Sequence, residues 1–379
     1  MKGLFIIFEG LSEHNGISKK IIAQKDGFLN NGIDIKLSSL VFDKTNSKRV
    51  FSGRTVEKEV IDRYSDNVRI SNYQRLTCFN GLLNYIKSNG INFIYIRYIH
   101  IANYFFINFL VKLKEMNVLV LLEIPTYPYD LEYKNVGTKQ RLLLSIEKKY
   151  RKKFNKYVYK IITFQNYDSI FGVETIKISN GIDISKIPMP VNVRLDDALN
   201  LIGVAGLNYW HGFDRLIEGL NIYYSSNPKR VVFFHIVGDT NNIIGNQYKN
   251  LVTKYNLESY VIFYDNKIGD ELDEVYEKCQ FGIGSLGIHR IGISEVKPLK
   301  SREYCARGIP FVYSFKDEDF DDKSFILKES PNDSPIDINR LIDFYYSNNF
   351  NNREIRRFAE ENLTWDVQVK RILEQLKFI

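Results

Sequence analysis

Two glutamates in the last third of the chain enclose two lysines and a proline, in the order Glu295, Lys297, Pro298, Lys300 and Glu303. Because proline has a fixed φ and no N–H to lose, this spacing predicts a helix that begins at Pro298. A helix N-terminus presents unpaired amides and the positive end of the helix dipole, and both favour phosphate oxygens. The two lysines strengthen that preference, so the segment predicts a binding site for a diphosphate.

The predicted helix gives the two glutamates different positions. Glu295 falls in the loop before the helix, whereas Glu303 falls inside it, about 7 to 8 Å along the axis from Pro298 at a rise of about 1.5 Å per residue. That separation is about the reach from a diphosphate to its attached ribose. The segment therefore predicts a nucleotide held by its phosphates and by one ribose hydroxyl. Leu299 is expected on the buried side of the helix.

Apolar runs of strand length alternate with helical patterns through most of the chain, which is typical of a parallel α/β architecture. Ten strands are expected, at residues 4–8, 34–40, 93–97, 118–123, 160–164, 201–205, 231–237, 261–264, 281–285 and 309–313. Five fall in each half of the chain, so the pattern predicts two sheets.

Two prolines in residues 186–191 interrupt any helix and suit an extended linker between domains. We therefore expect an N-terminal domain over residues 1–187 and a C-terminal domain over residues 188–363. The last segment, 364–379, carries aliphatic residues on one helical face and is expected to form a closing helix.

The composition is that of a soluble globular protein, with 44% hydrophobic and 26% charged residues and a formal net charge of +7. The longest apolar runs fall well short of the roughly 20 residues that a membrane span needs. Cys78, Cys279 and Cys305 are widely spaced and lack a C-x-x-C pair, which argues against a disulfide framework or a zinc site. We expect a cytoplasmic protein with reduced cysteines.

One segment concentrates positive charge, with Glu147 as its only counter-charge. Its basic residues are Lys148, Lys149, Arg151, Lys152, Lys153, Lys156 and Lys160. Leu143, Ile146, Tyr150 and Phe154 recur there at helical spacing, which predicts an amphipathic helix with a basic outer face. That face is either a solvated helix surface or a landing surface for anionic lipid headgroups. Nucleic acid is not expected, because no basic stripe interleaved with exposed aromatics accompanies it.

The pair Glu295 and Glu303, followed by Gly308-Ile309-Pro310, resembles the signature of the family 4 retaining glycosyltransferases. Other parts of the chain are similar to that family's donor domain (203–207, 210–220, 236–239), to a further landmark (179–183) and to the branch that builds bacterial capsular and exopolysaccharides (15–19, 96–98, 123–130).

The resemblance implies the GT-B fold, with two facing Rossmann-like domains and an interdomain cleft. It implies that the N-terminal domain binds the acceptor, that the C-terminal domain binds the donor, and that the closing helix packs back on the N-terminal domain. The implied reaction is retaining transfer of a hexose-type sugar from a nucleotide-diphosphate sugar to a hydroxyl of a lipid-linked oligosaccharide. No metal and no cofactor beyond the nucleotide sugar are implied, and the inner face of the cell membrane is an implied place of action.

The resemblance also assigns roles in the donor site. Glu295 would contact the transferred sugar, Glu303 would hold the ribose, and Lys300 would face the diphosphate and stabilise the charge of the leaving group. Lys297, Pro298 and Leu299 would complete the helix start. The loop with Gly206, Asn208 and His211 would lie beside the same phosphates. Here the chain departs from the family, because Leu207 and His211 stand where many members carry an arginine and a lysine.

In the N-terminal half, Asn15 and Gly16 resemble the loop that approaches the donor phosphate, although Gly16 could be a plain turn glycine. Arg97 ends a strand and is counted as a catalytic candidate, since ligands of parallel sheets bind beyond the carboxyl ends of strands. An ion pair of Arg97 with Glu123 is the alternative. His14, Tyr98 and Glu123 are candidates for the acceptor side.

Two other patterns are set aside. Residues 282–287 match the dinucleotide motif G-x-G-x-x-G, but no helix is expected to open within them. Asp317, Glu318, Asp319 and Asp321 mimic a metal-binding carboxylate set and are interpreted as a solvated acidic loop.

Two other functions remain open at this point. One is a nucleotide-sugar epimerase on the same fold. The other is a catalytically silent subunit that binds glycan or a partner enzyme.

Overall fold

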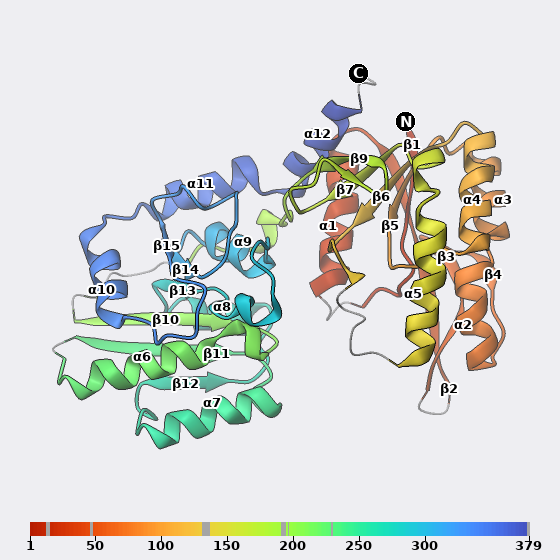
Figure 1. Ribbon diagram of the computed structural model, residues 1–379. Helices are drawn as coiled ribbons and strands as arrows, with labels where there is room; N and C mark the ends of the chain where they lie inside the picture. Colours follow the sequence, from red (N-terminus) through yellow and green to blue (C-terminus); the bar gives the residue numbers. More distant parts are fainter. Residues whose placement is uncertain are drawn as a thin grey trace. The chain divides into compact units, whose positions relative to one another are not determined.

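The computed structural model describes residues 1–12, 16–45, 48–130, 137–190, 195, 197–228 and 230–376. Contacts divide the chain into two compact units (Figure 1). The first combines Met1–Gly181 with Trp365–Ile379, and the second is Ile182–Thr364. His14 and Asn15 lie outside the described residues.

The sheet of the first unit has the strand order β4-β3-β2-β1-β5-β6-β7-β9-β8. Its strands are β1 (Lys2–Ile6), β2 (Asp34–Thr45), β3 (Lys48–Val56), β4 (Glu59–Arg63), β5 (Phe93–Arg97), β6 (Leu119–Ile124), β7 (Lys160–Thr163), β8 (Ser169–Ile170) and β9 (Val173–Lys177). Within this order, the neighbouring strands β2, β1, β5, β6, β7 and β9 pair in parallel. The remaining strands β3, β4 and β8 pair antiparallel at the two margins. This sheet is therefore a parallel core with hairpin margins.

Both faces of this sheet are buried, because successive residues of β1 and β5 point into different cores. Leu4, Ile6, Ile94 and Ile96 join one core, and Phe5, Ile7, Phe93 and Tyr95 join the other. Such continuous apolar strands are typical of parallel sheets covered on both sides. The helices of this unit are α1 (Gly16–Asn30), α2 (Val68–Thr77), α3 (Asn80–Asn89), α4 (Tyr104–Glu115), α5 (Thr138–Arg151) and α12 (Trp365–Gln375).

The closing helix α12 packs in the first unit, against α1. Trp365 lies so close to Gly27 that a Cβ there would come within 2.9 Å of its backbone, and a Cβ on Gly181 would come within 2.4 Å of its ring. Gln368 accepts a hydrogen bond from the amide of Ser179 at 2.8 Å. Two glycines and one buried amide therefore fix the position of α12.

The sheet of the second unit has the order β12-β11-β10-β13-β14-β15, and its strands pair in parallel. Its strands are β10 (Ala198–Val204), β11 (Val231–Val237), β12 (Val261–Tyr264), β13 (Phe281–Ile283), β14 (Phe311–Tyr313) and β15 (Ile326–Lys328). Its helices are α6 (Phe213–Ser225), α7 (Ile243–Lys254), α8 (Asp270–Tyr276), α9 (Leu299–Ala306), α10 (Ile338–Ser347) and α11 (Asn352–Asn362). This is the strand order of a doubly wound dinucleotide-type fold, whose ligands bind outside the carboxyl ends of the strands.

The ten predicted strands are present, with ends shifted by up to a few residues, while β3, β4, β8, β9 and β15 were not predicted. The missed strands are short or lie near a sheet margin, where polar residues are tolerated and the apolar pattern is weak. No helix among the described residues is long and apolar enough to cross a membrane.

Candidate functional site

The predicted diphosphate site centres on the start of α9. The helix begins at Leu299, one residue later than predicted, and Pro298 is its N-cap with extended backbone (φ −69, ψ 144). No described side chain caps the first amides of α9. Leu299 was expected to be buried, but its side chain is 38% exposed, because the helix turns Ser301, Arg302 and Tyr304 inward instead. The uncapped amides and an exposed apolar side chain thus occupy the same helix start.

Tyr304 anchors α9 to the carboxyl ends of two strands. Its hydroxyl lies 2.9 Å from the carbonyl oxygen of Ile283, and accepts from the amide of Val204 at 3.3 Å. A Cβ on Gly282 would lie 2.7 Å from the ring of Tyr304. The first glycine of the rejected G-x-G-x-x-G pattern therefore makes room for this ring, and no helix opens between residues 282 and 287.

Lys300 points into the protein from the first turn of α9. Its ammonium nitrogen is buried and has no hydrogen-bond partner among the described residues. The nearest aromatic ring is that of Phe213, whose centroid is 5.5 Å from Nζ. Burial lowers the pKa of Lys300 to about 7. A cation held in this way has much to gain from an anionic ligand.

His211, in the loop before α6, lies close enough to Lys300 for the charge of the lysine to act on its ring. Burial lowers the pKa of His211 to about 2, and the charge of Lys300 adds to this effect. The amide of Asn208 donates to Nδ1 of His211 at 3.1 Å. The neutral ring therefore carries its proton on Nε2, which makes His211 a hydrogen-bond donor at that atom and not a second cation.

The rest of this loop adopts a tight conformation with one open position. A Cβ on Gly206 would meet no atom within 4 Å, so a ligand could approach the backbone there. Gly212 has φ +66, and a Cβ would lie 2.6 Å from the amide nitrogen of Gly287. Leu207 is buried in the core, so its side chain replaces a charged residue of the resembled family with a packing contact.

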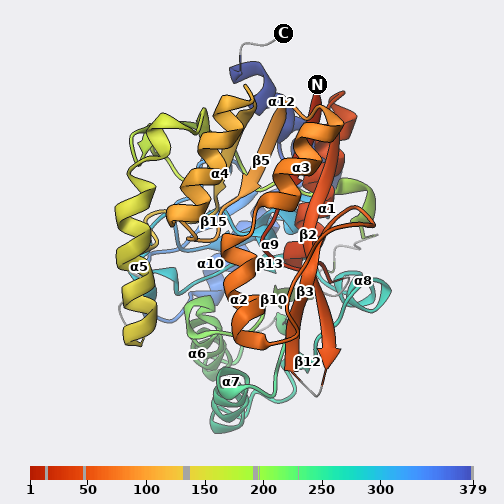
Figure 2. The same ribbon diagram turned by 90° about the vertical axis from the view of Figure 1, so that its right-hand side faces the viewer.

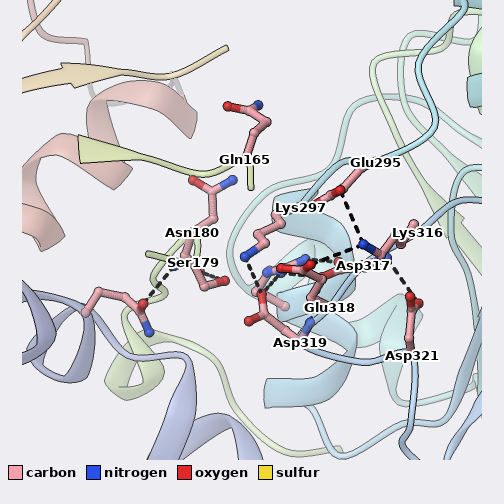
Figure 3. Close-up of polar contacts among 12 residues, drawn as sticks. Gln165, Ser179, Asn180, Glu295, Lys297, Lys316, Asp317, Glu318, Asp319 and Asp321 are labelled. Carbon is pink, nitrogen blue, oxygen red and sulfur yellow. Dashed lines mark hydrogen bonds and ion pairs between the residues drawn. The ribbon is translucent and has the colours of Figure 1, made fainter. Parts of the chain in front are cut away.

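Glu295 is held beside Lys316 (Figure 3). The two residues form a backbone bridge, in which the amide of Lys316 donates to Ser294 at 2.8 Å and the amide of Val296 donates to Lys316 at 3.2 Å. Lys316 Nζ lies 3.6 Å from Oε2 of Glu295 and 3.1 Å from Glu318. Oε1 of Glu295 is buried without a hydrogen-bond partner among the described residues. One carboxylate oxygen is therefore restrained, and the other has an unused capacity to accept a hydrogen bond.

The acidic loop after β14 is solvated only in part, because Glu318 is exposed whereas Asp317 is not. Asp317 is fully buried and binds the equally buried Arg302 of α9 through both carboxylate oxygens, and Arg302 also binds Asp319. Lys297 lies 3.9 Å from Asp319. The carboxylates thus neutralise Arg302 and Lys297. The sequence alone does not predict these ion pairs, because the partners lie in different elements. Among the described residues, no group of three or more His, Cys, Asp or Glu could hold a metal ion.

Glu303 is restrained by the arginine one turn further along α9. Oε1 of Glu303 accepts from Nε and Nη2 of Arg307 at 3.2 and 3.1 Å. Arg307 also binds Asp273 at 2.6 Å, and its guanidinium lies 3.8 Å from the ring centroid of Tyr276. The carboxylate of Glu303 is thus half-exposed and held by one of its oxygens.

In the first unit, Arg97 and Glu123 form the ion pair that was the alternative to a ligand contact. Glu123 is fully buried and also accepts from Gln24 and Tyr95, each at 2.7 Å. A direct contact of Glu123 with an acceptor, which was predicted, does not fit this burial. Arg97 is almost entirely buried, whereas Gly16 starts α1 in open space.

Tyr98 is also buried, and its hydroxyl donates to Glu147 at 2.7 Å. This burial does not fit a direct contact of Tyr98 with an acceptor, and its predicted place on the acceptor side stays a prediction. Lys20 was not predicted at all. Its ammonium binds Asn180 at 2.6 Å and lies 4.1 Å from the ring centroid of Phe164. Lys20 and Gln24 are both buried on the inner face of α1. Their spacing of four residues, on the same side of the helix, is the signal in the sequence that could have identified them.

No family model and no curated protein matches the sequence. Solved structures match over their full length. A glycosyltransferase from Rickettsia africae ESF-5 has 13% identity and a TM-score of 0.66, with 100% of this chain and 99% of that chain covered. A sucrose-phosphate synthase from Thermosynechococcus elongatus has 13% identity and a TM-score of 0.61, with 99% of each chain covered. The Anabaena protein HepE, in complex with UDP and glucose, has 12% identity and a TM-score of 0.57, with 100% of each chain covered.

These similarities confirm the predicted fold class. The chain has the GT-B fold, with two Rossmann-like domains built on the parallel sheets described above. Identities of 11 to 13% carry no more than the fold.

Proposed function

We propose that this chain is a glycosyltransferase that moves a hexose-type sugar from a nucleotide-diphosphate sugar to a hydroxyl of an oligosaccharide. The observation that carries the proposal is the buried ammonium of Lys300, which lacks a hydrogen-bond partner among the described residues. It lies one residue after the start of a helix whose first amides have no side-chain cap. Both features are satisfied by the same ligand, a diphosphate.

The sugar nucleotide supplies the anion that this site lacks. Its C1–O bond to the diphosphate breaks, and the acceptor oxygen bonds to C1 on the same face of the ring, while the acceptor proton leaves with the diphosphate. Negative charge grows on the leaving oxygen, where Lys300, the amides of α9 and Nε2–H of His211 would stabilise it. Because His211 is neutral, Lys300 would be the main compensating cation, with Lys297 as a second.

The two glutamates have separate tasks in this proposal. Glu295, with one carboxylate oxygen restrained by Lys316, would accept hydrogen bonds from hydroxyls of the transferred sugar. Glu303, restrained by Arg307, would accept from a ribose hydroxyl. Gly206 and Asn208 would lie along the phosphates, and Pro298 and Leu299 would border them.

The finer parts of the proposal rest on the sequence resemblance. These are membership of family 4, retention of configuration, no need for a metal, and an acceptor that is a lipid-linked oligosaccharide of a capsular or exopolysaccharide pathway. The N-terminal unit would bind that acceptor, with Arg97 as its catalytic candidate. UDP-glucose is the first donor to test, since HepE has been captured with UDP-glucose on the same fold.

A thermal-shift screen with UDP-, GDP-, ADP- and dTDP-sugars tests the proposal. At least one nucleotide sugar should raise the melting temperature of the wild type, and Lys300→Met should abolish the rise. Lys278→Met, at an exposed position of the same unit, is the matched control and should keep it. If no nucleotide sugar shifts the wild-type transition, the site does not bind a donor and the silent-subunit alternative holds. Change of the sugar ring without any acceptor, followed by NMR, would favour the epimerase instead.

A further inference from the structure

Only part of the predicted inner face of α5 packs on the first unit: Tyr150 and Phe154 meet the core as predicted, but the residues predicted in the preceding turns do not. The sequence pattern predicted that Leu143 and Ile146 face the core. Instead Leu142, Leu143 and Ile146 are 63%, 50% and 38% exposed, and Glu147 is buried. Leu144 is the residue of this leucine run that packs against the core. Helix α5 extends beyond the end of α4 in both views (yellow in Figures 1 and 2), and its first turns are exposed on all sides.

A buried polar cluster fixes this orientation. Glu147 accepts from the hydroxyls of Tyr98 and Tyr129 at 2.7 and 2.6 Å, and from Arg151 at 3.1 Å. Arg151 also binds Asp130 through two hydrogen bonds of 2.8 and 3.0 Å. Turning the leucines inward would strip Glu147 of three donors and leave buried hydroxyls unpaired, which is costly. The exposed aliphatic face is therefore a stable feature of the fold.

The exposed charged residues of α5 and of the turn after it that the structure describes are all basic. Lys139, Lys149, Lys152 and Lys153 are exposed on α5 and the turn after it. The only acidic residue of α5 is Glu147, which faces the core. Three residues of the predicted basic surface do not belong to it: Arg151 is mostly buried, Lys148 binds Asp130 at 3.1 Å, and Lys160 lies in β7 and binds Glu174 at 2.5 Å. The exposed face thus combines three aliphatic side chains with a basic margin.

We propose that this face docks on a bilayer with anionic headgroups, with Leu142, Leu143 and Ile146 inserted at the level of the headgroups. The aliphatic side chains would leave water for the acyl boundary, and Lys139, Lys149, Lys152 and Lys153 would contact the headgroup phosphates. A second copy of this chain fits less well, because two equal basic margins would face each other. The surface belongs to the first unit and the α9 site to the second, and docking does not rest on the proposed transfer.

Sedimentation of the full chain with vesicles tests the proposal. Vesicles of phosphatidylcholine with phosphatidylglycerol should bind the wild type, and vesicles of phosphatidylcholine alone should bind it far more weakly. The triple variant Leu142→Ser, Leu143→Ser, Ile146→Ser should lose about tenfold or more in binding. A matched triple variant at exposed isoleucines of the second unit, Ile222→Ser, Ile243→Ser, Ile268→Ser, should bind as the wild type does.

A second pair of measurements separates insertion from attraction of charges alone. Replacing Lys149, Lys152 and Lys153 by glutamine should also weaken binding, by about fivefold for each charge removed. The Leu143→Trp variant should show a blue shift of its emission on binding vesicles. Equal binding to both vesicle types, unchanged binding of the serine variant, or no blue shift would overturn the proposal. Dimerisation of the wild type that the serine variant abolishes would also overturn it, in favour of a second copy.

The same variants distinguish this proposal from the proposed function. The serine variant should keep the wild-type thermal shift with a nucleotide sugar, because α5 and α9 belong to different units. Loss of vesicle binding with the shift intact supports docking alone. An unfolded serine variant would be recognised by its circular dichroism, and the Leu143→Trp measurement would then decide.

Discussion

Arg302 and Asp317 form an ion pair in which neither side chain is exposed. Arg302 belongs to α9, and Asp317 follows Lys316, the residue paired with Glu295, in the loop after β14. The pair therefore couples the helix that carries Lys300 and Glu303 to the segment that holds Glu295. Burial raises the pKa of Asp317, and the guanidinium of Arg302 opposes that shift.

Removing one charge of this pair should be strongly destabilising. Asp317→Asn keeps the shape of the side chain but leaves the charge of Arg302 with Asp319 alone, and we expect a loss of about 3 to 5 kcal/mol in the free energy of unfolding. Urea denaturation would measure it. Asp322→Asn removes an exposed partner of Lys323 in the same loop and should cost far less, because an exposed ion pair contributes little to stability. Similar losses for the two variants would show that the buried pair has no special role.

Donor binding should depend on pH through Lys300. Burial lowers its pKa to about 7 in the free chain, far below the ordinary value for lysine, and a bound diphosphate would raise it again. Below pH 7 the ammonium is already charged, so affinity should be constant there and should fall as the pH rises above 7. Binding near pH 8 should take up a proton, because the donor stabilises the charged form.

Calorimetry of a nucleotide sugar in buffers of different ionisation enthalpy would measure that proton. Lys300→Met should abolish binding and with it the uptake, whereas a variant of Lys20, whose pKa burial also lowers to about 7, should keep both. Proton uptake that survives in Lys300→Met would remove Lys300 from the donor site.

The lowered pKa of Lys300 also affects the stability of the fold, and stability should change with pH in the opposite direction to donor affinity. Since the folded chain holds Lys300 with a lower pKa than the unfolded chain, the unfolded state binds more protons between pH 7 and about 10.5. The contribution of Lys300 to stability therefore rises with pH across that window, while donor affinity falls. A comparison of wild type and Lys300→Met by urea denaturation at pH 7 and pH 9 would test it, and the difference between them should shrink at the higher pH.

The sequence predicted the parts of the fold that local patterns determine. The continuous apolar runs of β1 and β5 identify a buried parallel sheet, and Pro298 locates the start of α9 to within one residue. The orientation of α5 could not be predicted in the same way, because the buried position of Glu147 depends on Tyr98 and Tyr129 from other parts of the chain. A carboxylate in a basic segment looks solvent-exposed until its distant donors are known.

In the candidate site, too, local patterns predicted some residues, while contacts with distant residues were not predicted. Glu295, Lys300 and Glu303 were identified from spacing and resemblance. The restraints on them, Lys316 and Arg307, were not, because an ion pair between a loop and a helix has no periodic pattern in the sequence. Lys20 was missed since a lysine on a helix is usually exposed, and its burial follows from Phe164 and Trp365 lying against it.

Glu303 should contribute to nucleotide affinity through the ribose. Glu303→Ala should weaken binding of a nucleotide sugar by about tenfold, which is the range for a lost charged hydrogen bond. Binding of inorganic pyrophosphate should be unchanged, since it has no ribose. Arg307→Met frees the carboxylate of Glu303 and should give a smaller loss in nucleotide affinity. Equal losses for nucleotide sugar and pyrophosphate would mean that Glu303 acts on the phosphates or on the fold.

Glu295 should act on turnover and not on nucleotide affinity. In Glu295→Ala the carboxylate that would contact the transferred sugar is gone, and kcat should fall by about a hundredfold or more, while the affinity for the nucleoside diphosphate stays within about twofold. Glu318→Ala is the matched control, because Glu318 binds the same Lys316 at 3.1 Å but has no assigned contact with the donor. A steady-state assay with the donor found in the thermal-shift screen, together with calorimetry of the free diphosphate, would separate the two effects. If Glu295→Ala lowers kcat and affinity equally, its carboxylate holds the nucleotide and has no separate task at the sugar.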